Sequence, residues 1–212
     1  MRNTLKIIIF STLFFLVLPV VGNSAEQNEE YLKRAWGKLA SMSGKFTATT
    51  YNAKDKQIDK AEGDFIVALP GKYKVEFTYG FDKGLIIVGD GKKVIHYDPD
   101  LESIQRYTPE SFLLNEPLSS IFYIPIEKNP HFSIVSSIEI NERIELNLVP
   151  KEKRTFVSNG KITFKNYLLT SLEVFYSSGD RTIFRFSLDK PTKTINDDTF
   201  KFSYPDDIGN QF

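Results

Sequence analysis

Apolar and polar residues alternate with a period of two in the middle of the chain, within residues 63–104. Tyr73, Val75, Phe77 and Tyr79 fall on one side of this pattern, and the polar residues between them fall on the other. Because successive side chains of a strand point to opposite faces, the pattern predicts a sheet with one apolar face and one wet face.

Turn residues divide this region into short strands. Asp90-Gly91 lies between the apolar runs 85–88 and 94–97. This dipeptide predicts a tight hairpin, because it readily adopts the positive φ that such a turn needs. The other runs with the texture of strands are 45–52, 62–69, 101–107, 134–140, 143–149, 160–164, 169–176 and 181–188, with Phe200 and Phe202 as a short closing strand. The strands do not alternate regularly with helices, so we expect an antiparallel sheet of about ten or eleven strands.

Residues 26–44 have a helical pattern instead. Apolar residues recur there at spacings of three and four, which predicts an amphipathic helix that ends at Gly44. The apolar positions are Tyr31, Leu32, Ala35, Trp36, Leu39 and Met42. The stripe fits a helix that lies on the sheet, and it fits a plain core helix equally well.

Two short apolar helices are expected between the two groups of strands. Pro109 and Pro117 stand at positions typical of helix starts. The apolar residues that follow them include Leu114, Leu118, Ile121 and Phe122. Short helices with this much apolar surface must lie on another element. They therefore cover or plug an open barrel end, or they fill an ordinary α+β core.

The first residues have the three-part layout of a secretory signal peptide. Residues 1–6 are basic, residues 7–18 are largely apolar, and Pro19 leads into small residues. The alternative is an uncleaved signal anchor, but about fifteen apolar residues are few for a span that ordinarily needs roughly twenty. We expect a cleaved signal peptide over residues 1–25 and a periplasmic domain over residues 26–212.

Composition excludes several classes of function. Lysine plus arginine and aspartate plus glutamate are equal, at 27 each, so no basic footprint for nucleic acid is present. The chain has no cysteine, which excludes disulfides, a thiol nucleophile, thiolate metal sites and lipidation of the chain itself through an N-terminal cysteine. The 212 residues, 41% of them hydrophobic, are enough for one core.

The sequence gives little support for catalysis. His96, followed by Asp98 and Asp100, resembles a set of metal ligands, but aspartate is also the ordinary residue of a proline turn at this place. His131 follows Pro130, and we expect it in an exposed loop. We therefore expect no enzyme, no metal and no cofactor.

Several of these segments, taken in order, resemble the periplasmic outer-membrane lipoprotein carrier family (LolA). The segments are Pro-Gly-Lys-Tyr-Lys at 70–74, Glu76, Leu-Ile-Ile-Val at 85–88, Asp-Gly-Lys-Lys at 90–93 and Tyr-Asp-Pro-Asp-Leu-Glu at 97–102. Each piece is ordinary by itself, and the ordered series is what carries the resemblance.

The resemblance implies a mainly β fold of the α+β class, an unclosed antiparallel β-barrel of about 10–11 strands with an α-helical lid of about three helices. It implies a monomeric, chaperone-like carrier that takes acylated lipoproteins from an inner-membrane lipoprotein-releasing ABC transporter. The carrier passes them to an outer-membrane lipoprotein acceptor. Residues 26–212 would form this lipoprotein-carrier domain.

The resemblance also implies where the acyl chains bind. Tyr73 and Val75 match inward positions of the family, although a plain core face explains them equally well, and Leu118 and Ile121 match apolar lid positions. The residues expected to line the cavity are Trp36, Tyr73, Val75, Phe77, Ile87, Ile95, Leu114, Leu118, Ile121, Phe122, Val174 and Phe186. Burying methylene groups is worth ~0.8 kcal/mol each, so one chain gains on the order of 10 kcal/mol before costs. A carrier of this kind needs no catalytic group.

The sequence departs from the family at the expected lid latch and in the cavity. Leu69 stands where the family often has an arginine that hydrogen-bonds to the lid, so closure here must rest on apolar packing. Val75 and Ile95 replace common aromatic residues, which predicts a roomier cavity if both point inward. The alternative to a carrier is a periplasmic regulatory domain of similar fold that senses lipid or protein. The single-domain length favours the carrier.

Overall fold

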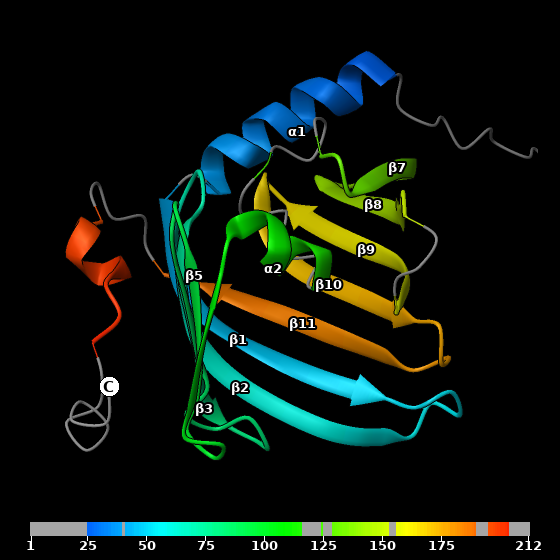
Figure 1. The fold of residues 1–212 in the computed structure, drawn as a ribbon. Coiled ribbons are helices and arrows are strands. Elements are labelled where there is room, and N and C mark those ends of the chain that lie inside the picture. The colour runs from blue at the N-terminus through cyan, green and yellow to red at the C-terminus, as the bar shows by residue number, and fades with distance from the viewer. Residues whose placement is uncertain are drawn as a thin grey trace, which may run out of the picture.

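The fold is one curved antiparallel sheet of eleven strands with a helix across one end (Figure 1). The computed structural model describes residues 25–39, 41–115, 124, 129–152, 156–189 and 195–203. The prediction of an unclosed antiparallel sheet of ten or eleven strands is confirmed. The expected signal peptide and the lid positions Leu118, Ile121 and Phe122 lie outside the described residues.

The elements follow one another with short connections. In chain order they are α1 (Ala25–Leu39), β1 (Ser41–Tyr51), β2 (Gln57–Ala68), β3 (Lys72–Tyr79), β4 (Ile86–Asp90), β5 (Val94–Asp98), β6 (Ser103–Tyr107), α2 (Pro109–Asn115), β7 (Phe132–Ile140), β8 (Arg143–Pro150), β9 (Val157–Lys165), β10 (Leu168–Tyr176), β11 (Arg181–Leu188) and the 3-10 helix η3 (Asp197–Phe200). No helix in these described ranges is both long enough and apolar enough to cross a membrane.

Two meanders make up the sheet. Strands β1 to β6 pair in sequence order, strands β7 to β11 do the same, and β1 pairs with β11 to join them. The junction runs from the pair Gly44–Leu188 to the pair Tyr51–Arg181. Strands β6 and β7 are therefore the two edges of the sheet, and the sheet is not closed.

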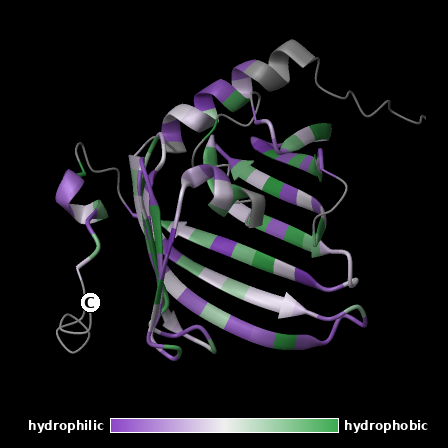
Figure 2. Cartoon of the chain, in the orientation of Figure 1, coloured by the Kyte–Doolittle hydropathy of each residue, from purple (hydrophilic) through white to green (hydrophobic). Residues whose placement is uncertain are grey.

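The alternation of residues along each strand separates a concave apolar face from a convex polar face. On β10, Leu172 and Val174 are buried in the core, and the intervening Glu173 points to the other side, where it pairs with Lys161 of β9. Figure 2 shows the same alternation as stripes along the strands. The sequence pattern thus determines which side of each strand is covered.

Helix α1 closes the concave side at one end of the sheet and packs against β10 and β1. Its Leu32 and Ala35 are buried, and Tyr31 packs edge-on against Phe164 of β9 with ring centroids 6.3 Å apart. The Tyr31 hydroxyl accepts a hydrogen bond from the backbone N–H of Tyr167 at 3.2 Å. The apolar stripe of this helix therefore covers the sheet, as one of the two interpretations predicts.

The predicted end of this helix at Gly44 is wrong. The helix ends at Leu39, and Gly44 lies inside β1, where it pairs with Phe65 and Leu188. A Cβ on Gly44 would lie 2.2 Å from the backbone oxygen of Ser187. Glycine is therefore required at this position because β11 approaches β1 too closely for a side chain.

The predicted closing strand at Phe200 and Phe202 is also wrong. Residues Asp197–Phe200 form a 3-10 helix, and the side chain of Asn196 caps it by accepting a hydrogen bond from the Asp198 N–H at 3.1 Å. The segment packs on the convex side of β3 and β4, with Phe200 buried (Figure 1). A local cap thus replaces the expected strand pairing.

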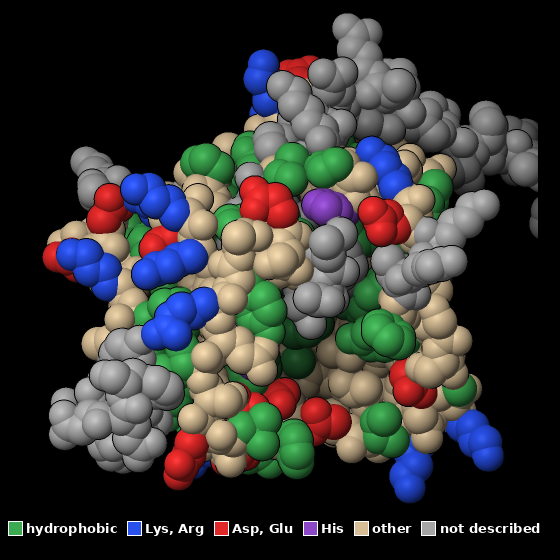
Figure 3. Space-filling view, in the orientation of Figure 1, with side chains coloured by type: hydrophobic (Ala, Val, Ile, Leu, Met, Phe, Trp, Pro, Cys, Tyr) green, Lys and Arg blue, Asp and Glu red, His purple; other side chains and the backbone are tan. Residues whose placement is uncertain are grey.

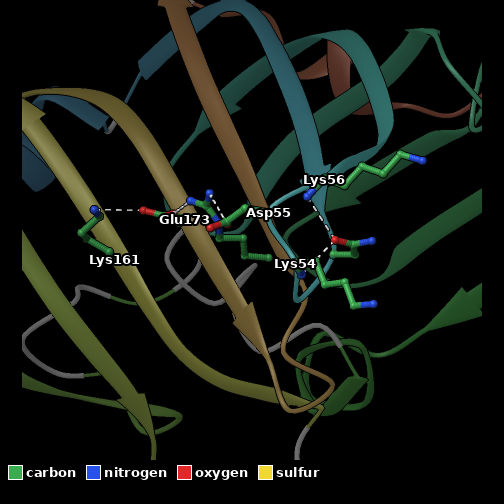
Figure 4. Close-up of polar contacts among 7 residues, drawn as sticks. Lys54, Asp55, Lys56, Lys161 and Glu173 are labelled. Atoms are coloured by element: carbon green, nitrogen blue, oxygen red, sulfur yellow. Dashed lines mark hydrogen bonds and ion pairs between the residues drawn. The ribbon is translucent and has the colours of Figure 1, made fainter.

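An ion-pair cluster ties four elements together on the convex face (Figure 4). The buried Glu173 carboxylate accepts hydrogen bonds from Lys161 Nζ at 2.9 Å and from Arg181 Nη1 at 2.8 Å. Arg181 also donates to Asp55 in the β1–β2 loop at 3.0 Å and stacks on the Tyr51 ring, with its Cζ 4.8 Å from the ring centroid. Burial raises the pKa of Glu173, but the hydrogen bonds from Lys161 and Arg181 outweigh burial and hold the pKa below its ordinary value.

Replacing Glu173 by glutamine should destabilise the protein at neutral pH and reduce its sensitivity to acid. Because the folded-state pKa is lowered, the stabilisation is complete above the ordinary value of 4.5 and is lost as the pH falls through the lower folded value. Urea unfolding at neutral pH and below pH 4.5 measures both effects. The control is Glu62→Gln, since Glu62 pairs with Lys60 on the surface and such pairs contribute little. Equal losses in the two variants would contradict the prediction.

Gly63 of β2 leaves room for the ring of Phe46 on the neighbouring strand. A Cβ on Gly63 would lie 2.5 Å from this ring and 2.4 Å from the backbone oxygen of Glu76. Gly63→Ala should therefore destabilise the protein by roughly 1–3 kcal/mol. Gly37→Ala, in the exposed interior of α1 with nothing within 4 Å of the new methyl, should stabilise it by roughly 0.5–1 kcal/mol. Thermal unfolding of the pair tests both signs.

Candidate ligand-binding site

The concave face is packed unevenly. On β8, β9 and β10 its side chains are almost completely buried, with exposures of 1% or less for Ile144, Leu146, Leu148, Ile162, Phe164, Leu169 and Val174. On β3, β4 and β11 the concave side chains of Val75, Phe77, Ile87, Phe184 and Phe186 are only half-buried. We call these five half-buried residues the open apolar wall.

Aromatic contacts connect the two sides of the open apolar wall. Phe46 packs edge-on against Phe77 with ring centroids 5.2 Å apart, and its centroid lies 6.2 Å from that of Phe184. Phe65 packs edge-on against Phe186 at 5.4 Å. The buried rings of Phe46 and Phe65 therefore form a fixed base under the exposed parts of the wall, since aromatic pairs at these distances are attractive.

The strand register extends the wall to the edge of the sheet. Phe65 pairs with Val75, Val75 with Ile87, and Ile87 with His96, so these four side chains lie in one row across β2 to β5. His96 is half-buried. One polar ring therefore stands in an otherwise apolar row.

The space-filling view shows this side of the molecule hollowed, with hydrophobic side chains in the depression and acidic side chains near its lower rim (Figure 3). An apolar concavity with few polar groups is the usual form of a small-molecule or lipid site. The geometry is suited to binding an apolar ligand by burial.

Most of the described residues that the sequence assigns to the cavity do lie on the concave face. Tyr73 and Val174 are completely buried in the core, whereas Val75, Phe77, Ile87 and Phe186 belong to the open apolar wall. Trp36 of α1 is half-buried and packs against the same core. Tyr73 and Val174 therefore support the wall rather than face free space.

Ile95 was expected to point inward, and the register corrects this. Ile95 pairs with Val88, and Val88 pairs with Lys74 on the convex face. Ile95 and Val88 are buried, but on the side that carries the 3-10 helix η3. The expected enlargement of the cavity at Ile95 is therefore absent, and the inward position beside it belongs to His96.

The expected latch residue and the helix that begins the expected lid both pack against the core. Leu69 is half-buried and packs against the core, in line with an apolar rather than hydrogen-bonded contact. Phe112 and Leu113 of α2 are buried in the core cluster, and Phe112 lies 5.9 Å from the Tyr107 ring of β6. Leu114 belongs to α2, but its side chain lies outside the described part of the chain.

The structure favours a turn over a metal site near His96. The Asp98 carboxylate accepts hydrogen bonds from the backbone N–H groups of Asp100 at 3.0 Å and Leu101 at 3.2 Å, as an aspartate in a turn does. The described ranges contain no cluster of ligands that could hold a metal ion. His131, expected to be exposed, is half-buried, and its backbone N–H donates to the buried Asn129 side chain at 2.8 Å.

Sequence reasoning missed Phe46, Phe65, Phe184 and His96 as residues of the site. Phe184 shares a strand face with Phe186, two residues along, so the alternation alone was enough to find it. His96 has the same parity as Val94, but the face of β5 becomes known only when its pairing with β4 is known.

Comparison with known proteins places this fold in a described family. The family model described as "Outer membrane lipoprotein carrier protein LolA" matches residues 37–203. Two outer-membrane lipoprotein carrier proteins are each 25% identical to the chain. The one from Pseudomonas putida aligns over 196 residues, 92% of this chain and 90% of its own length. The one from Chromohalobacter salexigens aligns over 191 residues, 90% of each.

Solved structures show the same fold. A LolA superfamily protein from Nitrosomonas europaea superposes with a TM-score of 0.50 at 12% identity, covering 82% of this chain and 97% of its own. A DUF1329 family protein from Desulfovibrio piger also gives a TM-score of 0.50, at 10% identity, covering 82% and 96%. At such identities these two structures establish the fold alone.

Two substitutions on β11 test the open apolar wall as a binding surface. Phe186→Ala should weaken the binding of an apolar fluorescent dye by roughly fivefold or more, because it removes an aromatic ring that faces the hollow. Ile183→Ala, on the convex face of the same strand, should change the affinity by less than about twofold. Dye titration gives both values, and equal losses would show that the dye binds elsewhere.

Proposed function

This chain belongs to the outer membrane lipoprotein carrier protein (LolA) family, and we propose that it carries lipoproteins through the periplasm by binding their acyl chains in the concave side of the sheet. It takes them from an inner-membrane transporter and passes them to an outer-membrane acceptor. The observation that carries the proposal is the open apolar wall. Half-buried aromatic and aliphatic residues face a hollow there, while the concave side chains of β8, β9 and β10 are almost completely buried.

Burial alone supplies the affinity that this function needs. Each methylene group that leaves water gains ~0.8 kcal/mol, so one long acyl chain is worth on the order of 10 kcal/mol before the costs of ordering. Val75, Ile87 and Phe186 offer apolar surface that is only half-covered without a ligand. Such a site holds a chain without covalent chemistry, and the proposed carrier is not an enzyme.

Release requires a competitor for the same surface. Helix α2 follows β6 directly and buries Phe112 and Leu113 in the core that supports the wall. We assign the role of lid to α2 and to the apolar positions Leu118, Ile121 and Phe122 that follow it in the sequence. A lid that binds the wall in the absence of cargo lowers the apparent affinity for cargo, which permits hand-over.

A release assay tests the function directly. Incubated with inner-membrane vesicles that contain the lipoprotein-releasing transporter and an acylated lipoprotein, the protein should form a water-soluble one-to-one complex with that lipoprotein. Phe186→Ala should give markedly less complex, because it reduces the apolar surface, and Ile183→Ala should give about as much as the unaltered chain. Size-exclusion chromatography with immunodetection measures the complex. Retention of only free lipid or of a signalling protein would contradict the carrier and favour the regulatory alternative.

A further inference from the structure

His96 is a polar residue in the apolar row of the proposed binding site. On β5 it pairs with Ile87 on one side and with Gln105 of β6 on the other, and Ile87 continues the row to Val75 and Phe65. An imidazole at this place faces the same hollow as the open apolar wall. A polar group in such a position costs desolvation energy unless it obtains a hydrogen bond.

The imidazole obtains no such bond from the described part of the chain. Its Nδ1 atom is completely shielded and has no hydrogen-bond partner there. The Nε2 atom has no hydrogen bond within the described residues either, and it is not among the shielded atoms that lack a partner, so it keeps some exposure. The ring therefore has one shielded nitrogen and one accessible nitrogen, on a residue that the strand register places on the concave face.

This orientation determines which nitrogen carries the proton. Burial lowers the pKa of His96 despite the opposing effects of Asp98 and Asp82, so the ring is neutral at neutral pH and has a single N–H. An N–H at the closed-off Nδ1 would be a buried donor without an acceptor, which is costlier than an unused lone pair. The proton belongs on Nε2, where it forms a neutral donor that faces the hollow.

The charges around His96 determine what this donor can bind. Asp98 lies two residues along the same strand face, and Asp82 lies in the β3–β4 loop. Burial raises the pKa of Asp82, and the neighbouring Asp59 and Asp98 raise it further. Two carboxyl groups near the ring disfavour an anionic ligand such as a free fatty acid. A neutral carbonyl oxygen has no such penalty.

We propose that Nε2–H of His96 donates a hydrogen bond to the carbonyl oxygen of a neutral ester or amide that joins an acyl chain to its lipoprotein. This assignment rests on the proposed function and adds a specificity to it. The apolar wall binds the chain, and His96 fixes the depth to which the chain enters, because the carbonyl group marks the end of the apolar segment. His96 is thus a positioning residue for cargo.

Matched lipids test the assignment. The probes are a peptide that carries ester-linked palmitoyl chains, its ether-linked analogue, which has no ester carbonyl, and free palmitate. The unaltered chain should bind the ester probe about fivefold to tenfold more tightly than the ether probe, since one hydrogen bond in a shielded site gives a ratio of this order. It should also prefer the ester probe to palmitate.

Three variants distinguish the effect of the N–H donor on binding from the effect of the aromatic ring. His96→Phe keeps a ring and should abolish the preference for ester over ether, while ether binding stays the same or improves. His96→Gln keeps an N–H donor and should retain part of the preference. His131→Phe, which alters the other histidine, next to β7 at the far edge of the sheet, should retain all of it. The assignment would be overturned if His96→Phe kept the full preference for the ester probe, or if it lost affinity equally for the ester and the ether probes.

Heteronuclear NMR of the ring nitrogens provides a second readout that does not depend on affinity. The free protein should show the Nε2–H tautomer at His96, with an Nε2 signal that shifts on adding the ester probe and not the ether probe. An Nδ1–H tautomer would overturn the assignment. If the unaltered chain binds neither probe, the acyl-chain function itself fails, an outcome distinct from binding both probes equally well.

Discussion

The pairing of β1 with β11 is the interaction on which the rest of the structure depends. It joins the meander β1–β6 to the meander β7–β11 through residues about 130 to 145 positions apart in sequence. Gly44 allows the two backbones to approach, and Phe46 with Phe186 and Ala48 with Phe184 make facing pairs on the concave side. The convex ion pairs of Arg181 with Glu173 and with Asp55 hold the same junction from outside.

The concave face has two regions with different roles. Strands β8, β9 and β10 are packed as protein interiors are and supply most of the fully buried side chains. Strands β3, β4 and β11, on either side of the junction, leave part of their concave surface half-covered and so gain less stabilisation from burial. The packed strands stabilise the sheet, and the half-covered surface can exchange one apolar contact for another. The proposed carrier needs both properties, because the same surface must bind cargo and release it.

The local sequence pattern was sufficient to predict the strands and their antiparallel arrangement, because period-two alternation and Asp-Gly or Asp-Pro turns can be recognised from residues adjacent in the sequence. It was insufficient for Ile95 and His96, because the face of a short strand depends on its register with another strand. Gly44 illustrates a second limit. A glycine that follows a helical pattern is typical of a helix cap. Only the pairing with β11, which is remote in the sequence, shows that glycine is needed here because two strands approach closely. The polar cap at Asn196 similarly outweighed the strand propensity of Phe200 and Phe202.

The two unpaired edges of the sheet have a mechanical consequence. A closed β-barrel has a fixed diameter, which is set by the number of strands and by their stagger. An arc that ends at β6 and β7 has no such constraint, so it can widen or tighten by small changes of twist at each strand pair without breaking a ladder. The interior can therefore adjust to ligands of different size at little energetic cost, and in the proposed role one sheet would accommodate varied cargo.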